Sequence, residues 1–415
     1  MSQSPSHLAD GAKSPVMTRP LSLSLIKMAG WVSLSGWVAS LAPLAQAAMV
    51  DLPELSPKVT QGGDDHAGPA ETAPWLAQTP NLSPDQQDRL DELLRQGQAR
   101  VNAKDYGAAI AAYQQAAQID PRHPRIFSGL AFLYLQQEKY PEAIDAYRQA
   151  LTLAPNNLTF QYGLAHSFYR NGEGDEARAV YQAILSRHPR EVNAYLGVAT
   201  LQLEAKDYSG AMATYERLLQ VAPGNVQAYE ALANLLSQQG DHQQALTYLN
   251  RALQANPKQE RLYLRAANLQ LLLDNPTLAQ ESLRRALALN PNHPEANYQL
   301  GYLLYRANDQ DGALRHLLKA VQTNPELVAA HALLGELLLE RQQYLRAAAS
   351  YRKVAEANPN DPAILYNLGL ALWGQGLSSQ ARSNIELAIL FYERQGDEIG
   401  AERARQLVNL MMSQN

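Results

Sequence analysis

The sequence predicts an all-α solenoid, a stack of repeated helix pairs, and three observations support this fold class. A proline recurs every 34 residues over 238 residues, with no insertion or deletion. A small residue precedes each proline by 12 residues, and a second small residue precedes the first by another 12. Large apolar residues recur between them at helical spacing. A strict period of this length is typical of units that contact only their neighbours. The prolines are Pro121, Pro155, Pro189, Pro223, Pro257, Pro291, Pro325 and Pro359.

Each 34-residue unit is predicted to be a helix–turn–helix. Small residues let two antiparallel helices approach closely, and a neighbouring Leu or Tyr fills the remaining space. The proline ends the second helix, because the residue before it is disfavoured in helical geometry. The alanines before the prolines are Ala109, Ala143, Ala177, Ala211, Ala245, Ala279, Ala313, Ala347 and Ala381. The earlier small residues are Gly97, Ala131, Ala165, Ala199, Ala233, Ala267, Gly301, Gly335 and Gly369.

The chain begins with a segment that has the layout of a signal peptide. Basic residues up to Lys27 precede 23 uncharged residues, 28–50, and Ala45-Gln46-Ala47 has the small-residue pattern of a cleavage site. We therefore expect residues 1–47 to direct export. The alternative is an uncleaved signal anchor over about residues 28–50, since such a length is enough to span a bilayer. Either reading places the repeats outside the cytoplasm, in the periplasm or another extracytoplasmic space, and the second ties them to the membrane.

The remaining elements follow in order. Residues 48–83 are rich in Pro, Gly, Asp and Thr, which predicts a flexible linker. Nine repeats are expected over residues 84–393, with Ser83 capping the first helix. Residues 394–415 are expected to form a final amphipathic helix that covers the open end of the stack. Its core-facing residues would be Ala401, Ala404, Leu407, Val408 and Met411.

This pattern resembles the tetratricopeptide repeat (TPR) family. The resemblance rests on nine units in register, each with small residues at positions 8 and 20, a large apolar residue at 24 and, in eight of them, Pro at 32. The last unit has lost its proline and has Glu393 at that position instead. The resemblance implies a right-handed superhelical solenoid whose first helices line a concave groove, with positions 5, 9 and 12 facing the groove.

The resemblance therefore gives candidate contacts for a protein or peptide partner. Repeats three, seven and nine place mainly aromatic stripes there with i, i+4, i+7 spacing, with Leu370 in the middle of the last stripe, and repeats five and six place polar residues there. Such aromatic groups anchor extended peptides or partner helices, although each stripe could equally pack against a neighbouring helix. The candidates are Tyr162, His166, Tyr169, Asn234, Arg261, Arg265, Asn268, Tyr298, Tyr302, Tyr305, Tyr366 and Trp373.

A carboxylate clamp of the kind found in chaperone-binding TPR proteins is not expected. Arg261 and Arg265 match one pair of clamp positions, but Leu196, Thr200 and Ala231 occupy the corresponding positions of the two preceding repeats. The two arginines could still hold an acidic group, with ordinary solvated side chains as the alternative.

Composition argues against several other classes of function. The net charge of −5 comes from a near-even mixture of signs, so no basic stripe is available for a nucleic acid. The chain has no cysteine, and its nine histidines form no ligand pair at helical spacing, so we expect no metal and no cofactor. His123, His188 and His293 are interpreted as surface residues of the turns. Glu336 and Glu340 could pair across a cleft, although solvated helix faces explain them as well. No catalytic motif is found, which predicts a protein that is not an enzyme.

Three hypotheses of function remain. The first is an exported scaffold or adaptor that binds a protein or peptide partner in its groove, in the assembly of an envelope complex. The second, which overlaps with it, is an accessory subunit of a polysaccharide or protein secretion system. The third is an enzyme that acts on glycans, with the aromatic groove as a sugar platform.

Overall fold

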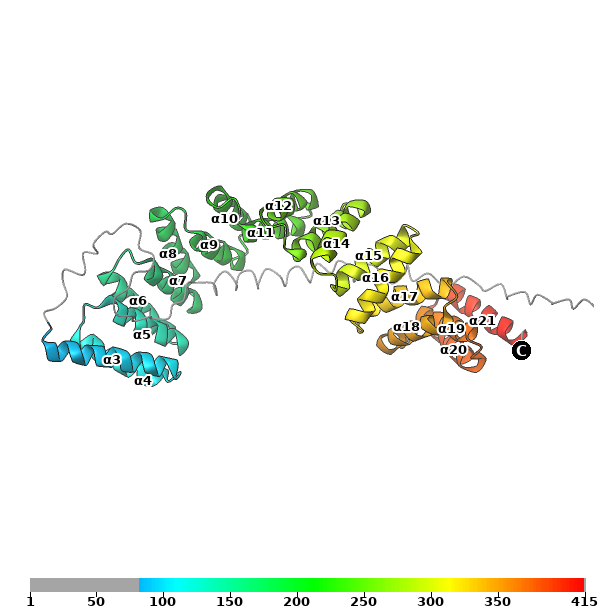
Figure 1. The fold of residues 1–415 in the computed structure, drawn as a ribbon, viewed down its shortest axis with the longest axis horizontal. Coiled ribbons are helices and arrows are strands. Elements are labelled where there is room, and N and C mark those ends of the chain that lie inside the picture. Colours follow the sequence, from blue (N-terminus) through cyan, green and yellow to red (C-terminus); the bar gives the residue numbers. More distant parts are fainter. Residues whose placement is uncertain (1–81, 414–415) are drawn as a thin grey trace, which may run out of the picture. The chain divides into compact units, whose positions relative to one another are not determined.

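The computed structural model describes residues 82–413, and all its regular elements are α-helices, nineteen within this range. The described chain divides after Asn256 into two compact blocks, here called the N-terminal block (82–256) and the C-terminal block (257–413). Within each block, successive helices pack as antiparallel pairs that stack on the next pair (Figure 1). This confirms the all-α solenoid. The predicted leader and nearly all of the predicted linker lie outside the described residues.

Five helix pairs form the N-terminal block and four form the C-terminal block, one pair per repeat. The first helices are α3 (Pro84–Asn102), α5 (Pro124–Gln136), α7 (Leu158–Arg170), α9 (Val192–Glu204), α11 (Val226–Gln238), α13 (Glu260–Leu272), α15 (Pro294–Arg306), α17 (Val328–Glu340) and α19 (Pro362–Gly374). The second helices are α4 (Tyr106–Ile119), α6 (Tyr140–Leu153), α8 (Gly174–Arg187), α10 (Tyr208–Val221), α12 (His242–Ala255), α14 (Pro276–Leu289), α16 (Gln310–Thr323), α18 (Tyr344–Ala357) and α20 (Ser378–Gln395).

The recurring prolines end the second helices as the sequence predicts. In α14 the residue before the proline, Asn290, has left helical geometry with φ −135° and ψ 88°, and its N–H still bonds the carbonyl of Ala286. At the other end of the array, Ser83 caps α3 and forms a capping box with Gln86, which confirms the expected start.

The turn within each repeat has a left-handed residue that the sequence does not reveal. At the same position of all nine repeats φ is positive, yet only three of the nine residues are glycines. Glu138 (φ 59°) is one of the six others, and its N–H bonds the carbonyl of Leu135. A non-glycine residue in this region costs roughly 1–2 kcal/mol, so the surrounding helix packing must stabilise the turn.

The core of each block lies where the small residues meet large ones. All nine recurring alanines have no exposed surface. Tyr113, Tyr147 and Tyr181, which occupy position 24 of repeats one to three, are also buried, and each packs against a glycine at position 6 of the following repeat. An added Cβ at Gly163 would lie 2.3 Å from Cζ of Tyr147. These glycines are therefore required by the preceding tyrosine ring and not by the local backbone.

The last pair differs from the others because it lacks the proline. Helix α20 has 18 residues where the other second helices have 14, and the residue that caps its C-terminus, Gly396, adopts a left-handed conformation. A further helix, α21 (Glu398–Ser413), then packs on α20, so it begins later than the residue 394 that the sequence indicates. Its residues Ala401, Ala404, Leu407 and Met411 are buried and Val408 is partly buried in the core of the C-terminal block, as expected of a cap. Over residues 82–413, none of the helices is both long and apolar enough to cross a membrane.

Candidate functional site

Three tyrosines form a stripe on α15 in the C-terminal block. Tyr298, Tyr302 and Tyr305 are each partly buried and spaced i, i+4, i+7, as the sequence predicts. The hydroxyl oxygen of Tyr305 lies 2.7 Å from a carboxylate oxygen of Glu340 and 3.3 Å from one of Glu336, both on α17. Burial, followed by the charge of Glu336, raises the pKa of Tyr305, so this hydroxyl keeps its proton and donates a hydrogen bond to a carboxylate.

A corresponding stripe lies on α7 in the N-terminal block. The Tyr162 hydroxyl donates to Glu191 at 3.2 Å, and the Tyr169 hydroxyl donates to Glu204 of α9 at 2.5 Å. Burial, together with the hydrogen bond to Glu204, raises the pKa of Tyr169 to about 12. Burial also lowers the pKa of His166 to about 4, and the charge of Arg170 adds to this. His166 is therefore neutral at pH 7.

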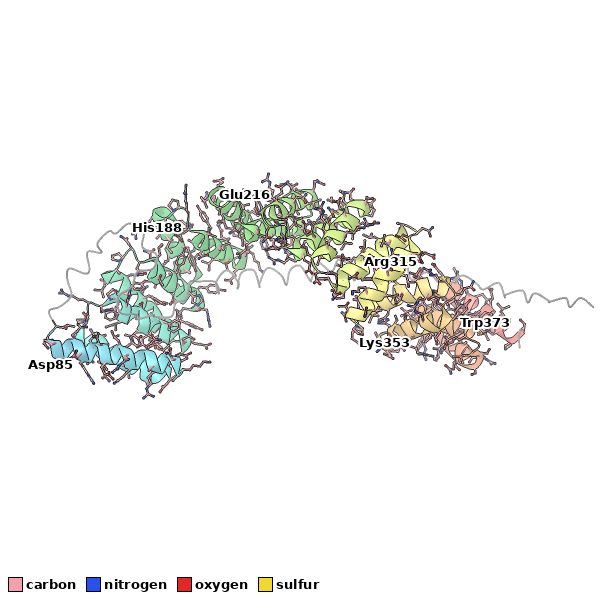
Figure 2. The ribbon with its side chains drawn as sticks, in the orientation of Figure 1. Asp85, His188, Glu216, Arg315, Lys353 and Trp373 are labelled. Atoms are coloured by element: carbon pink, nitrogen blue, oxygen red, sulfur yellow. The ribbon has the colours of Figure 1, made fainter. Side chains whose placement is uncertain are left out.

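Three of the predicted contact residues are buried in the described structure. Asn234 and Tyr366 have no exposed surface and Tyr162 retains 4%. Tyr366 lies in the same core cluster as the capping helix, because the last repeat packs against its cap. In this arrangement these side chains stabilise the stack and offer a partner almost no area. Trp373 of α19 is partly buried and lies in the last repeat (Figure 2).

The polar candidates of α13 lie at the start of the C-terminal block. Arg261 is exposed and Arg265 is partly buried. The side-chain oxygen of Asn268 accepts a hydrogen bond of 3.2 Å from Gln299 on α15. Thus Asn268 joins two neighbouring first helices, and its binding role stays a prediction.

Sequence reasoning missed the acidic partners of the tyrosines. Glu191 and Glu204 were not considered. For Glu336 the sequence left two alternatives, pairing across a cleft or a solvated helix face, and the solvated face is wrong because only 5% of this residue is exposed. Glu340 is exposed, but the Tyr305 hydroxyl holds it. A signal was present in the sequence: glutamate occupies position 13 only in the repeats that follow a tyrosine at position 12.

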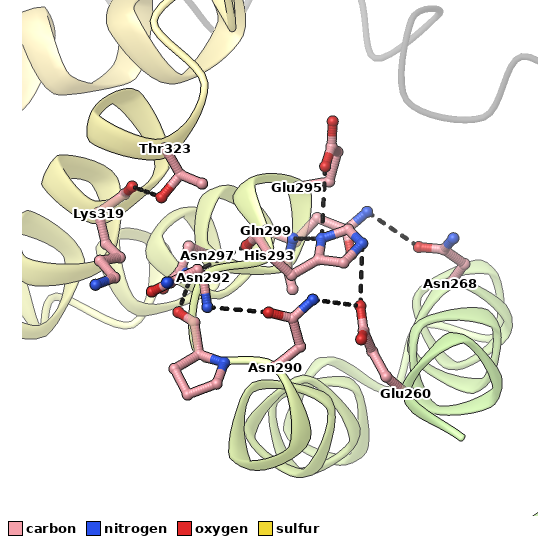
Figure 3. A network of polar contacts seen from close by, with 12 residues as sticks. Glu260, Asn268, Asn290, Asn292, His293, Glu295, Asn297, Gln299, Lys319 and Thr323 are labelled. Carbon is pink, nitrogen blue, oxygen red and sulfur yellow. Dashed lines mark hydrogen bonds and ion pairs between the residues drawn. The ribbon is translucent and has the colours of Figure 1, made fainter. Parts of the chain in front are cut away.

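His293 lies at a turn and is partly exposed, as the sequence predicts, but its side chain is held by other residues. Its Nδ1 accepts a hydrogen bond of 3.2 Å from the N–H of Ala296, so His293 caps α15 (Figure 3). Its Nε2 lies 3.4 Å from Glu260 of α13, and Glu260 also accepts a hydrogen bond from Asn290. An accepting Nδ1 places the proton of the neutral ring on Nε2, which can then donate to Glu260. This network joins two repeats and is structural.

A metal site is not indicated within the described range. In residues 82–413 no three His, Asp or Glu side chains are grouped so that they could hold a metal ion. Whether the protein has an enzymatic activity stays a prediction from the sequence.

Comparison with protein families places this arrangement in a known class. One tetratricopeptide repeat model matches residues 134–201 and 202–269, and a second matches 94–157 and 264–327. A third TPR repeat model matches 335–376, so together the matches cover more than half of the chain. The chain belongs to the tetratricopeptide repeat family. As in TPR proteins generally, its stacked helix pairs form a scaffold for interaction with other proteins.

Individual proteins are similar to part of this chain, and the chain spans only a small part of the curated relative that it matches. A TPR repeat-containing protein of Picosynechococcus sp. is 35% identical over 65 residues, which cover 16% of this chain and 17% of that protein. The solved structure of YrrB, described as a TPR protein with an unusual peptide-binding site, is 22% identical, with 46% of this chain and 97% of YrrB covered at a TM-score of 0.42. MamA of Desulfovibrio magneticus RS-1 is 21% identical, with 40% and 95% covered and a TM-score of 0.36.

Proposed function

We propose that this protein is an exported scaffold that binds a protein or peptide partner through the first-helix face, the surface formed by positions 5, 9 and 12 of the first helices. The observation that supports it best is the stripe of Tyr298, Tyr302 and Tyr305. All three rings are only partly buried, and the hydroxyls of Tyr302 and Tyr305 have polar partners. Such rings combine a large contact area with few rotatable bonds, which suits the anchoring of a peptide.

The experiment is affinity capture from an envelope extract with residues 49–415 as bait. The test variant replaces Tyr298, Tyr302 and Tyr305 with alanine. The matched control is Tyr208→Ala, because Tyr208 is a 41% exposed tyrosine on a second helix. Circular dichroism and thermal unfolding of each bait establish that it is folded.

We expect a partner that the wild type and the Tyr208 variant retain and the triple variant loses. A partner retained by all three baits would contradict a role for the first-helix face. Proteins identified by mass spectrometry in the capture would show whether the partner belongs to an envelope complex.

Export is the second part of the proposal and rests on the basic start, the uncharged segment 28–50 and the Ala45-Gln46-Ala47 motif. Cell fractionation with N-terminal sequencing of the mature protein tests it. A new terminus at residue 48 in the extracytoplasmic fraction is expected for cleavage. An intact chain in the membrane fraction would favour the anchor, and an intact cytoplasmic chain would contradict export.

A further inference from the structure

The second helices of the C-terminal block carry a group of cations on their outer side. Figure 1 shows α14, α16, α18 and α20 in succession along one side of this block. Positions 22, 25, 26 and 29 lie on one face of each second helix, away from the buried positions 20, 24 and 27. We call these four positions of repeats six to nine the outer face. In repeats six to eight they hold six cations, Arg284, Arg285, Arg315, Lys319, Arg352 and Lys353, and two carboxylates, Glu281 and Glu356.

Both of these carboxylates are already paired. Arg285 contacts Glu281 at 3.0 Å, and Lys353 contacts Glu356 at 3.1 Å. The remaining cations of the outer face have no carboxylate within ion-pair distance in residues 82–413. They are Arg284, which donates to the amide oxygen of Gln280, and Arg315, Lys319 and Arg352.

The other carboxylates near these helices lie at the helix ends. Asp311, in the first turn of α16, pairs with Arg341 at 2.7 Å. Asp309 caps α16 by accepting a hydrogen bond of 2.8 Å from the N–H of Gly312. The remaining acidic residues of the adjoining turns are Asp274, Glu326 and Asp361. The four unpaired cations lie in the middle of α14, α16 and α18, so the positive charge is separated from the acidic ends.

The cations of neighbouring helices reach the same place. His316 of α16 is half-buried, and its Nδ1 lies 2.9 Å from the side-chain oxygen of Asn297. Burial lowers the pKa of His316, and the charges of Arg315 and Arg284 lower it further, against the opposing charge of Asp309. Arg284 and Arg315 therefore act on one ring although they belong to different repeats. The near-even mixture of signs in the whole chain thus conceals a local positive surface.

Exposed leucines lie beside these cations. On α18, Leu345 is 71% exposed and precedes Arg352 by seven residues, so the two share one helical stripe. On α14, Leu278 precedes Arg285 by the same interval. Of the ten large apolar side chains that are exposed in residues 82–413, five belong to these second helices: Leu278, Leu289, Leu345, Leu387 and Leu390.

Cations without carboxylate partners, next to exposed leucines, fit the surface of an anionic bilayer. Each Lys or Arg near such a surface strengthens binding about fivefold, because lipid phosphates attract it. Leucine side chains enter the boundary between headgroups and acyl chains, while the long basic side chains reach the phosphates. A soluble polyanion would pair with the cations but leave the leucines in water. The bilayer is therefore the partner that uses both kinds of side chain.

We infer that the outer face of the C-terminal block binds the surface of an anionic lipid bilayer, with its four unpaired cations against lipid phosphates and the exposed leucines in the headgroup layer. The first-helix face, to which the proposed function assigns a peptide, consists of other positions on other helices. Membrane binding by the outer face is thus a separate property and does not depend on the proposed function.

The test is co-sedimentation with vesicles of phosphatidylcholine alone, or of equal parts phosphatidylcholine and phosphatidylglycerol. The protein is residues 49–415, so that the apolar part of the predicted leader cannot itself bind lipid. The test variant is Arg315→Gln/Lys319→Gln/Arg352→Gln, which removes three of the unpaired cations. Circular dichroism and thermal unfolding establish that each protein is folded.

The matched control is a variant that loses the same charge from the N-terminal block. It replaces three exposed arginines with glutamine: Arg122, Arg125 and Arg190. We expect the wild type and this control to bind the anionic vesicles and not the neutral ones, and the binding to weaken as salt is added. The test variant should bind about a hundredfold more weakly than the wild type.

A fluorescent label tests which face meets the lipid. The chain has no cysteine, so Leu345→Cys carries an environment-sensitive dye at one place. The control is Tyr208→Cys, an exposed position on a second helix of the N-terminal block. Anionic vesicles should shift the emission of the label at residue 345 to the blue and leave the label at residue 208 unchanged.

Several outcomes would overturn the inference. These are no binding of the wild type to anionic vesicles, equal binding by the test and control variants, binding that does not require phosphatidylglycerol, and an equal blue shift at both labels. Retention of the protein on dextran sulfate without binding to vesicles would identify a soluble polyanion as the partner and would also overturn it.

Discussion

The contact between Tyr147 and Gly163 makes the substitution Gly163→Ala a sharp test of the packing between repeats two and three. The new Cβ would lie 2.3 Å from Cζ and 2.6 Å from the hydroxyl oxygen of Tyr147, where ordinary contacts are about 3.5–4 Å. The ring cannot move toward solvent, because Tyr147 is 1% exposed. Overpacking of this kind costs about 1–3 kcal/mol, and the better helix propensity of alanine offsets about 0.5–1 kcal/mol. We expect a net destabilisation of about 1–2 kcal/mol.

The free energy of unfolding is measured by urea unfolding followed by circular dichroism. Native-state hydrogen exchange of the α7 amides then shows whether the loss of stability is centred on this helix. The control is Gly107→Ala on α4, an exposed glycine whose added Cβ would meet only Asp105, at 3.9 Å. This control should be neutral or slightly more stable than the wild type. Equal stability of the Gly163 and Gly107 variants would refute the reasoning.

A compensating substitution tests the contact without relying on the absolute destabilisation that either single substitution causes. Tyr147→Leu removes the ring, and the sequence itself shows that a leucine at position 24 is followed by a larger residue at position 6: Gln299 follows Leu283, and Leu333 follows Leu317. The double variant Tyr147→Leu/Gly163→Ala should therefore be more stable than the sum of the two single effects predicts. We expect a coupling of about 1 kcal/mol or more, and a coupling near zero would contradict the proposed contact.

Three further predictions concern other features. His166 stays neutral when folded, with a pKa of about 4 against 6.5 unfolded, so protonation of the unfolded chain removes stability as the pH falls from about 6.5 to 4. His166→Phe, which copies Phe132 of the preceding repeat, should flatten the pH dependence of the urea midpoint over this range; an unchanged slope would be inconsistent with a buried neutral histidine. His293→Ala should lower the free energy of unfolding by about 0.5–2 kcal/mol through loss of the α15 cap, while His293→Asn, which copies the cap Asn157, should retain most of it. Equal loss in both variants would argue against capping. Leu407→Ala should cost about 2–5 kcal/mol, since this side chain is 1% exposed in the capping helix, and proteolysis should then cut α21 first; resistance equal to that of the wild type would show that the cap is not held by this contact.

The fold could be predicted from the sequence because its period is unbroken. Proline at one position in eight repeats and alanine at another in all nine have the same structural consequence each time, so these individually weak signals support one another. The left-handed turn was not predictable in the same way. Lys104, Glu138 and four other non-glycine residues adopt it, and only tertiary packing makes this conformation acceptable.

The candidate site was predicted less well because positions 5, 9 and 12 do not have equal burial in every repeat. Tyr298 and Tyr366 occupy the same position of their repeats, yet Tyr298 is partly exposed and Tyr366 is not. The difference depends on the neighbouring helices, which the repeat pattern does not specify. The tyrosine–glutamate hydrogen bonds likewise join residues 35 apart, which only the stacking of two repeats brings together.

The pairing of tyrosine with glycine across repeats has a consequence for how such an array can gain or lose repeats in evolution. A tandem copy of repeat three would place Tyr181 before a second Gly163, and the ring would again meet a glycine. A tandem copy of repeat eight would place Tyr351 before a second Leu333, and the two side chains would compete for the same space. Tandem copies of repeats two and three are therefore tolerated by the core, whereas a copy of repeat eight requires a matched change at one of these two positions.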